Sequence, residues 1–386
     1  MRAIANARNV ESYTYWHNSH WMAAGNPPLA MATVWNQCKH GVSYFLAWHR
    51  GFLYYFEQTL RKLSGYPAFA LPYWDYYKNP KLPAIYTAPK LEDGSPNPLY
   101  WKRRTGTSVE GLSFASFENA IVKFPFGPEP SFEYLVERNP HNRVHNQVGG
   151  SMGEVATAPA DPIFYAHHAN IDRYWSCWLA AGGKRAMPAP DDLWWDQRFF
   201  YNTSLTWNVS VRAMNDTRAL GYTYSDLRFP KPAAGASLPA RPPVAFTGSE
   251  NVAGPIALTL EPVSVAIALE PQLARAGKLA LVLDGVRLTP AGAMGGYDVG
   301  VYLDLPEVRV PVSQELRYLA GEFGPFELTM GAMPGMAVSA AGRVLRFAAA
   351  PQQSTAVVSF VPSGLPQGVS RRAVLASIDR IRIVPA

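Results

Sequence analysis

The sequence predicts two domains of different class, a mainly α-helical domain followed by an all-β, sandwich-like domain. The chain has 386 residues, which is enough for two domains that each bury a core. All 8 histidines and all 11 tryptophans lie before residue 208, whereas the residues after 244 form short alternating apolar runs. Between these regions, residues 230–244 are rich in proline and alanine, which is typical of a semi-rigid linker. We therefore assign residues 1–229 to the helical domain and residues 245–386 to the β domain.

Two helices are predicted in the first domain because apolar residues recur there at three- and four-residue spacing. The first covers residues 44–60, which contain no proline, and Gly65 follows as a stop signal. The second begins near Pro162 and continues to Gly182. Asp161 supplies an N-cap for it, and proline suits the first position of a helix.

The second domain is predicted to consist of short strands, because apolar and polar residues alternate in runs that turn residues separate. Several such runs in one domain favour a β-sandwich or barrel. They include residues 278–284, 297–304, 354–360 and 380–384.

The composition excludes several classes of protein. The net charge of +6 is modest and the basic residues are scattered, which argues against a nucleic-acid-binding protein. No run of about 18 apolar residues is present, so we expect no membrane span. Residues 1–10 carry no apolar stretch flanked by basic residues, so we expect no secretory signal and a chain that is cytoplasmic or exported after trimming. Two cysteines cannot form a disulfide framework.

The histidines form two groups with metal-binding potential. His141 and His145 are four residues apart, so on a helix both rings lie on one face and can reach one ion. The adjacent pair His167 and His168 opens the second predicted helix and can supply a third ligand.

The earlier group contains His17, His20, His40 and His49. His40 and His49 are nine residues apart, which on a continuous helix gives opposite faces at about 180°. They converge only if His40 lies in a loop before the helix of His49, and Gly41 is compatible with that break.

Imidazole ligands suit copper, zinc, iron or nickel. No Glu-x-x-His pattern indicates a di-iron bundle, and no cysteine pairs indicate a structural zinc site. Two copper ions, each bound by three histidines, account best for the two groups of histidines.

Several separate stretches within residues 12–225 resemble the type-3 copper proteins of the tyrosinase and polyphenol oxidase family. They are Cys38–Gly41, Phe45–Arg50 with Phe56-Glu57, Leu71–Asp75, Pro140–His145, Asp161–Trp175 and the paired-tyrosine motif Gly221–Tyr224. The resemblance implies a four-helix-bundle core with two copper ions and O₂ as co-substrate. The β-rich tail is similar, more loosely, to the C-terminal domain of plant and some bacterial members.

The resemblance makes His40 and His49 ligands of the first copper. The third ligand is either His17 or His20, and we favour His20 because it stands eight residues after Ser12, as in the family segment. His17 is then a close neighbour of the site.

The second copper would bind His141, His145 and His168. The resemblance points to the second of the adjacent histidines as the ligand, so His167 is expected beside the ligands. Neighbours on a helix point about 100° apart, so both cannot face one ion. Residues expected around the substrate pocket are Arg143, Asn146, Met152 in the flexible loop 149–153, and His167. Each of the first three is equally explained as an ordinary polar or loop residue without a role.

Cys38 has two interpretations. A lone cysteine is ordinarily a small buried apolar residue. The Cys-x-His spacing to His40, however, resembles fungal tyrosinases, in which the sulfur is joined to the ring by a thioether bond that orients the ligand. Cys177 is expected to be a core residue beside Trp175 and Trp178.

The resemblance also implies a base for monophenol hydroxylation. Glu137 lies four residues before His141 and Asn142 follows it, positions at which the family orders a water that takes the phenol proton. Alternatively, Glu137 pairs with Arg138 on the surface and Asn142 is a turn residue.

These features together predict a tyrosinase active in melanin or pigment synthesis, acting on small phenols without nucleic-acid or membrane partners. A catechol or o-aminophenol oxidase without monophenolase activity is the alternative, and a dioxygen carrier is a more distant one. A copper-delivery protein is a further expected partner. The C-terminal domain is expected to cover the copper site through loops such as Glu322–Phe326 and to keep the enzyme latent.

Overall fold

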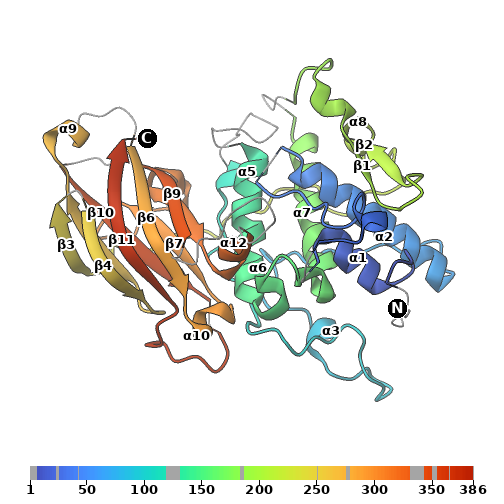
Figure 1. Ribbon diagram of the computed structural model, residues 1–386, viewed down its shortest axis with the longest axis horizontal. Coiled ribbons are helices and arrows are strands. Elements are labelled where there is room, and N and C mark those ends of the chain that lie inside the picture. Colours follow the sequence, from blue (N-terminus) through green and yellow to red (C-terminus); the bar gives the residue numbers. More distant parts are fainter. Residues whose placement is uncertain are drawn as a thin grey trace. The chain divides into compact units, whose positions relative to one another are not determined.

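The computed structural model describes residues 7–22, 26–41, 43–118, 131–182, 187–249, 251–274, 279–330, 343–349, 354–364 and 366–385. The chain divides into two compact units. The first unit comprises Met1–Arg103, Ser116–Val144 and Val155–Lys231, and the second comprises Arg104–Ala115, His145–Glu154 and Pro232–Ala386. The predicted fold class, a helical core with a C-terminal β region, is confirmed (Figure 1).

The first unit is built around two long helices, α2 (Phe45–Ser64) and α7 (Ile163–Ala180), which pack against each other. Both were predicted. Helix α2 ends where Gly65 adopts a left-handed conformation with φ 65°. At the start of α7, the Asp161 carboxylate accepts a hydrogen bond from the Ile163 N–H at 3.0 Å, which supplies the expected cap.

Shorter elements complete this unit. They are α1 (Tyr13–His20), η1 (Leu29–Met31), α3 (Ala84–Thr87), α5 (Phe132–Val136), η2 (Glu137–Asn142), η4 (Ala158–Ala160), η5 (Leu193–Asp196), β1 (Arg198–Phe200), β2 (Asn208–Ser210) and α8 (Val211–Met214). Helix α4 (Ala115–Glu118) begins at the last residue of a second-unit segment, and α6 (Arg143–Val148) passes from the first unit into the second. Strands β1 and β2 form an antiparallel pair.

A buried ion pair joins the two long helices. Arg50 of α2 is fully buried, and its Nε donates to Asp172 Oδ1 of α7 at 2.5 Å. The guanidinium carbon lies 3.7 Å from the ring centroid of Trp175. The other carboxylate oxygen of Asp172 accepts the hydroxyls of Tyr222 and Tyr224 at 2.7 and 2.5 Å. The paired-tyrosine motif therefore fastens the end of this unit to its central helices.

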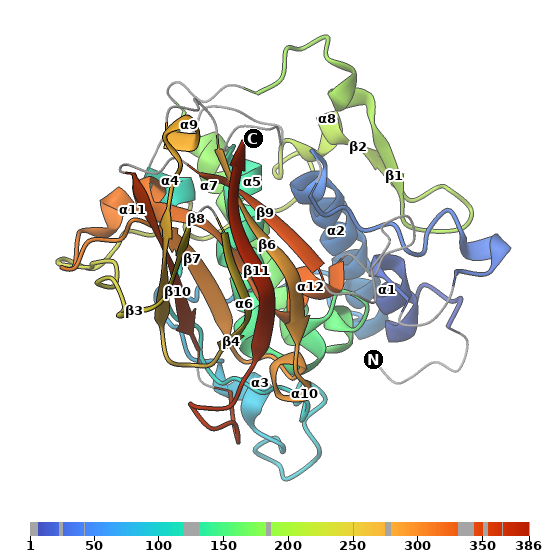
Figure 2. The same ribbon diagram turned by 60° about the vertical axis from the view of Figure 1, so that its left-hand side comes forward.

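The second unit contains a five-stranded and a four-stranded sheet (Figure 2). The first has the order β3-β5-β10-β7-β8 and the second β4-β11-β6-β9. Their bounds are β3 (Val244–Ser249), β4 (Asn251–Leu258), β5 (Val263–Ala268), β6 (Leu279–Leu288), β7 (Asp298–Leu303), β8 (Leu319–Phe323), β9 (Arg343–Ala349), β10 (Thr355–Ser363) and β11 (Ala376–Pro385). The four runs predicted as strands correspond to β6, β7, β10 and β11. Lys278, which opens the first of these runs, lies outside the described residues.

The core of the second unit forms because alternate residues of its strands are apolar. Ile378, Ile381 and Ile383 of β11 are nearly fully buried, and a β-bulge between Ile378 and Arg380 keeps the apolar side facing inward. The segment predicted as a linker packs on this unit, since the Leu238 N–H donates to the Val310 carbonyl at 2.7 Å. Strand β3 begins at Val244, one residue inside that predicted segment.

Several short helical elements also belong to the second unit. They are η3 (Gly150–Gly153), α9 (Pro271–Ala274), α10 (Pro290–Ala293), η6 (Val312–Gln314), α11 (Glu315–Tyr318) and α12 (Pro325–Met330). Within the described part of the chain, no helix combines the length and apolarity needed to cross a bilayer.

Candidate metal centre

Three histidines from separate elements meet in the first unit. Helix α1 contributes His20, the loop before α2 contributes His40, and α2 itself contributes His49. The ring centroids are 5.5 Å apart for His20–His40, 5.6 Å for His20–His49 and 5.2 Å for His40–His49. His40 can join because it lies off the helix, beside Gly41 with φ 66°. This is the break that the nine-residue spacing requires.

The hydrogen bonds of His20 and His49 involve only one nitrogen of each ring. His20 Nδ1 bonds to the Val155 carbonyl at 3.1 Å and His49 Nδ1 to the Phe45 carbonyl at 2.8 Å. Since a carbonyl only accepts, Nδ1 carries the hydrogen and Nε2 keeps its lone pair. Both Nε2 atoms are buried without a hydrogen-bond partner among the described residues. A buried polar atom without a hydrogen-bond partner lowers the stability of the fold by about 1–3 kcal/mol, and a bound metal ion would offset this loss.

His17 points elsewhere. Its Nε2 lies 2.5 Å from the Ala156 carbonyl, and the side chain is half-buried, whereas His20 is fully buried. The geometry thus favours His20 as the third member of this histidine group.

Cys38 lies beside His40. Its Sγ is 3.1 Å from His40 Nδ1, and the potential ligand atoms of His20, Cys38 and His40 all lie within 4.8 Å of one another. Burial raises the pKa of the Cys38 thiol well above its usual value. Cys177 is also buried, and burial raises its pKa to about 11, as expected for a core thiol.

A second group of histidines adjoins the first. His141 comes from η2, and His167 and His168 come from α7. The ring centroid of His141 is 4.9 Å from that of His168 and 5.2 Å from that of His167, and ligand nitrogens of all three lie within 4.8 Å of one another. His168 also stacks on His49 at 4.5 Å, so the two groups touch.

The local chain explains how His141 reaches this position. Asn139 has an extended backbone, φ −146° and ψ 116°, and Pro140 follows inside η2. Proline disfavours the helical region in the residue before it, so the helix is interrupted immediately before the histidine. The helix then continues as α6, with His145 four residues after His141.

Burial keeps five of these histidines neutral. Burial, followed by the neighbouring His141, lowers the pKa of His49 to about 3, and burial lowers that of His141 to about 3. Burial first and neighbouring histidines second lower the pKa of His20, His40 and His167 well below the usual value. At neutral pH these rings are therefore neutral donors, the form that binds a metal cation.

Glu137 and Asn142, the two residues expected to order a proton-accepting water, make different contacts at the histidine groups. Glu137 is 3% exposed, and its Oε1 accepts the Gly41 N–H at 2.7 Å, next to His40. The predicted alternative of an exposed Glu137 is therefore wrong. Asn142 Oδ1 lies 2.7 Å from His141 Nδ1 and so orients this ring as the carbonyls orient His20 and His49.

His145 begins the segment His145–Glu154, which belongs to the second unit. Its Nδ1 bonds to the Met152 carbonyl at 2.8 Å. The ring stacks on Phe326 with centroids 4.1 Å apart and planes 16° from parallel. Met152 lies in the helical turn η3 with its side chain fully buried, so the loop predicted as flexible is an ordered helical turn.

Asn146 connects His145 to the turn that carries Phe326. Its amide nitrogen donates to Asp298 Oδ1 and to Glu327 Oε2, both at 2.7 Å. Its amide oxygen accepts the Phe326 N–H at 2.7 Å. Arg143, the other polar residue expected at the pocket mouth, is buried at 3% exposure.

Comparison with known proteins agrees with this architecture. The family model described as the common central domain of tyrosinase matches residues 8–111 and 102–181. A tyrosinase of Hahella sp. (strain CCB-MM4) is 33% identical over 293 residues, 64% of this chain and 61% of that protein. A chloroplastic polyphenol oxidase of Malus domestica is 34% identical over 236 residues, 50% of this chain and 39% of that protein. The matched region thus spans less than two thirds of either relative.

Solved structures show the same fold. Latent apple tyrosinase aligns with a TM-score of 0.54 at 24% identity, over 97% of this chain and 89% of that one. Latent aurone synthase, a polyphenol oxidase, aligns with a TM-score of 0.54 at 19% identity, over 99% of this chain and 86% of that one.

The helical core brings together two groups of histidines whose imidazole nitrogens are able to bind metal ions. Residues 8–181 match the common central domain of tyrosinase, and the chain is similar to tyrosinases and polyphenol oxidases, which supports a type-3 copper protein. This family implies a dinuclear copper site, and the donor set of the structure fits one.

Proposed function

We propose that the protein is a dicopper oxidase that uses O₂ to hydroxylate monophenols and to oxidise o-diphenols to o-quinones. The observation that carries this proposal is the contact between two groups of buried, neutral histidines. The first copper would be held by His20, His40 and His49, and the second by His141, His145 and His168. When bound, the two ions would supply two-electron exchange with O₂.

The surrounding residues would orient these ligands and exclude water. Backbone carbonyls fix the tautomer of His20, His49 and His145, and the Asn142 amide oxygen does so for His141. Phe164 packs on His168 at 4.1 Å and Phe45 on His141 at 4.7 Å, so the ligands lie among apolar rings. The short Cys38–His40 contact supports the thioether proposal, which peptide mass after complete unfolding would test.

Glu137 is proposed to accept the proton of a monophenol, directly or through a water. Its burial beside the loop of His40 supports this role. A general base typically contributes about 10²–10⁴-fold to a rate. We therefore expect Glu137→Gln to lower monophenol kcat/KM by about that range and to change catechol oxidation far less. Equal losses on both substrates would contradict the assignment.

A catechol or o-aminophenol oxidase without monophenolase activity is the second candidate. It is favoured by the hydrogen bonds that Glu137 and Asn142 already make, to Gly41 and to His141 respectively. Oxygen consumption with tyramine, catechol and o-aminophenol on the same copper-loaded sample separates the two. Turnover of tyramine supports a tyrosinase, and turnover of catechol alone supports the second candidate. Two bound copper ions without turnover of any phenol would favour a dioxygen carrier.

We further propose that the β domain shields the copper site and that Phe326 is its blocking residue. The Phe326 ring stacks on His145, one of the proposed ligands of the second copper, and so covers one face of that ring. The hydrogen bonds of Asn146 hold the turn that presents this ring. The two solved relatives are described as latent enzymes, which agrees with this proposal.

Removal of the ring tests the shield. Phe326→Ala should raise catechol turnover without a change in bound copper, as should proteolysis within residues 230–244. Phe246→Ala is a matched control, because Phe246 lies on strand β3 and is 37% exposed. No gain from Phe326→Ala, or the same gain from the control, would contradict the proposal.

A further inference from the structure

A line of oxidisable rings leads from the histidine centre toward the surface of the first unit. Trp48 packs edge-on against His49 with centroids 4.9 Å apart and against His20 at 6.0 Å. The Trp48 ring also contacts Tyr201 at a centroid distance of 6.1 Å, and the Tyr201 ring lies 5.2 Å from that of Tyr55. Each step is within the usual range of ring contacts.

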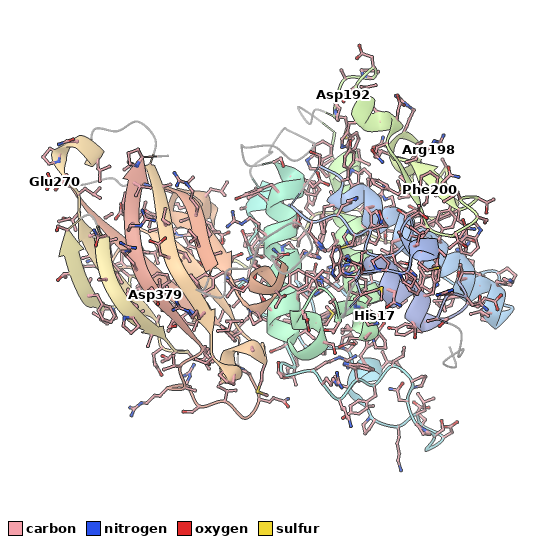
Figure 3. All side chains as sticks on the ribbon, in the orientation of Figure 1. His17, Asp192, Arg198, Phe200, Glu270 and Asp379 are labelled. Carbon is pink, nitrogen blue, oxygen red and sulfur yellow. The ribbon has the colours of Figure 1, made fainter. Side chains whose placement is uncertain are left out.

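The line ends at half-buried rings. Tyr55 stacks on Trp207 at 5.3 Å with planes 6° apart, and it contacts Tyr54 at 5.1 Å. All three side chains are partly exposed, whereas Trp48 and Tyr201 are 1% exposed. Tyr54 also lines a surface pocket of about 430 Å³. The line therefore runs from the buried ligands to solvent. Phe200, labelled in Figure 3, marks the end of β1, directly before Tyr201.

The other rings on these ligands are of a different kind. Among the described residues, His20 and His49 contact Phe45, Phe52 and Phe164 besides Trp48 and other histidines. Phenylalanine is not oxidised under conditions that oxidise tryptophan and tyrosine. Trp48 is thus the one readily oxidised ring in these contacts, and it is the ring from which the line starts.

We propose that Trp48, Tyr201 and Tyr55 form an electron-transfer path that carries oxidising equivalents from the metal centre to the surface of the protein. The proposal rests on the copper–oxygen function proposed above. Its role is protective, because an oxidising equivalent that no phenol consumes would otherwise attack the histidine ligands.

The chemistry balances with hydrogen peroxide as the oxidant and surface tyrosine as the donor. One peroxide takes two electrons and two protons and becomes two waters. Two tyrosine side chains each lose one electron and the phenolic proton and become neutral radicals. The electrons pass through Tyr201 and Trp48 to the centre, while each phenolic proton leaves to solvent from a half-exposed residue. A phenol or thiol in solution then returns one electron and one proton to each radical.

Local hydrogen bonds favour this direction. The Tyr201 hydroxyl donates to the Trp48 carbonyl at 2.9 Å, in the buried part of the line. A carbonyl cannot take up the proton, so Tyr201 serves as a bridge and does not hold a stable radical. The Tyr55 hydroxyl donates to the Asn208 carbonyl at 3.1 Å and lies near solvent, where its proton can be lost. The radical should therefore come to rest at Tyr54 or Tyr55.

The test compares Trp48→Phe with the wild-type protein and with Trp195→Phe as control. Trp195 is also buried, at 7% exposure, but it packs against Trp194 and Arg212. Each copper-loaded protein is treated with hydrogen peroxide in the absence of phenols. Radicals are recorded by electron paramagnetic resonance after rapid freezing, and oxidised residues are located by peptide mass spectrometry.

In wild type and in Trp195→Phe we expect a tyrosyl signal and oxidation at Tyr54, Tyr55 or Trp207. In Trp48→Phe we expect a several-fold weaker signal and increased oxidation of His20 and His49. The same pattern in all three proteins would overturn the proposal, as would a Trp195→Phe pattern equal to that of Trp48→Phe. Copper content is measured first in each sample. Failure to bind copper contradicts the proposed function as well, whereas two bound coppers with an unchanged oxidation pattern overturn only the electron path.

Discussion

Helices α2 and α7 carry two buried polar regions that differ in one respect. At Arg50 and Asp172, each charged group has protein partners, including Ser176, Met214 and the paired tyrosines. At the neighbouring residue His49, the ring uses Nδ1 for a carbonyl and leaves the buried Nε2 without a partner among the described residues. A buried polar network in which every group has a hydrogen-bond partner has a structural role. A buried ring nitrogen without a protein partner is instead suited to bind a metal ion.

The largest effect is expected when the metal-free protein is acidified, because protonation of the buried histidines should lower its free energy of unfolding. The folded pKa values of His49 and His141 are lowered to about 3 from an ordinary 6.5. Below pH 6.5 the unfolded chain therefore binds more protons than the folded one, so the free energy of unfolding falls as the pH falls. The slope should approach about 1.4 kcal/mol per pH unit for each such histidine.

Urea unfolding between pH 7.5 and about 4.5, followed by tryptophan fluorescence, measures this slope. Fluorescence reports on the first unit, because all 11 tryptophans belong to it. The copper-loaded protein is the control, and it should be more stable at neutral pH because the metal binds only the folded state. A free energy of unfolding independent of pH would show that these rings are not held neutral by burial.

Arg50→Met should lower the free energy of unfolding by removing the Arg50–Asp172 ion pair. The substitution leaves the Asp172 carboxylate buried without its cation, which costs about 3–5 kcal/mol. Arg212→Met is the matched control, since its partner Asp196 lies 3.4 Å away and both side chains are more than half exposed. Such a surface pair contributes at most about 1 kcal/mol. Similar free energies of unfolding for the two variants would contradict the structural role of Arg50.

The sequence allowed prediction of features that depend on local spacing. The positions of α2 and α7 followed from apolar periodicity and terminal signals, and the need for a break between His40 and His49 followed from helix geometry. Contacts between distant residues could not be predicted. Glu137 meets Gly41 across 96 positions and Asn146 meets Phe326 across 180, and neither contact leaves a periodic signal. The clustering of His145–Glu154 with the β unit was missed for the same reason.

Asn142→Ala should weaken copper binding at the second group of histidines. It removes the side-chain acceptor of His141 Nδ1 but leaves every proposed ligand in place. Loss of such a partner typically lowers metal affinity by about 10–100-fold. Competition with a copper chelator measures this effect, and Asn202→Ala, which alters an exposed loop, is the control. An unchanged copper affinity would show that Asn142 does not orient the ligand.

The smallest effect is expected at the end of α2, outside both polar regions. Gly65 has φ 65°, and a Cβ placed there would meet no atom within 4 Å. Gly65→Ala therefore tests backbone conformation alone, because crowding is absent. A left-handed conformation costs a residue with a Cβ about 1–2 kcal/mol, so stability should fall by about 1 kcal/mol. Copper affinity should not change, since the helix end lies four turns beyond His49 (about 24 Å). A change in copper affinity would mean that the packing of α2 and the geometry of its histidine are coupled along the whole helix.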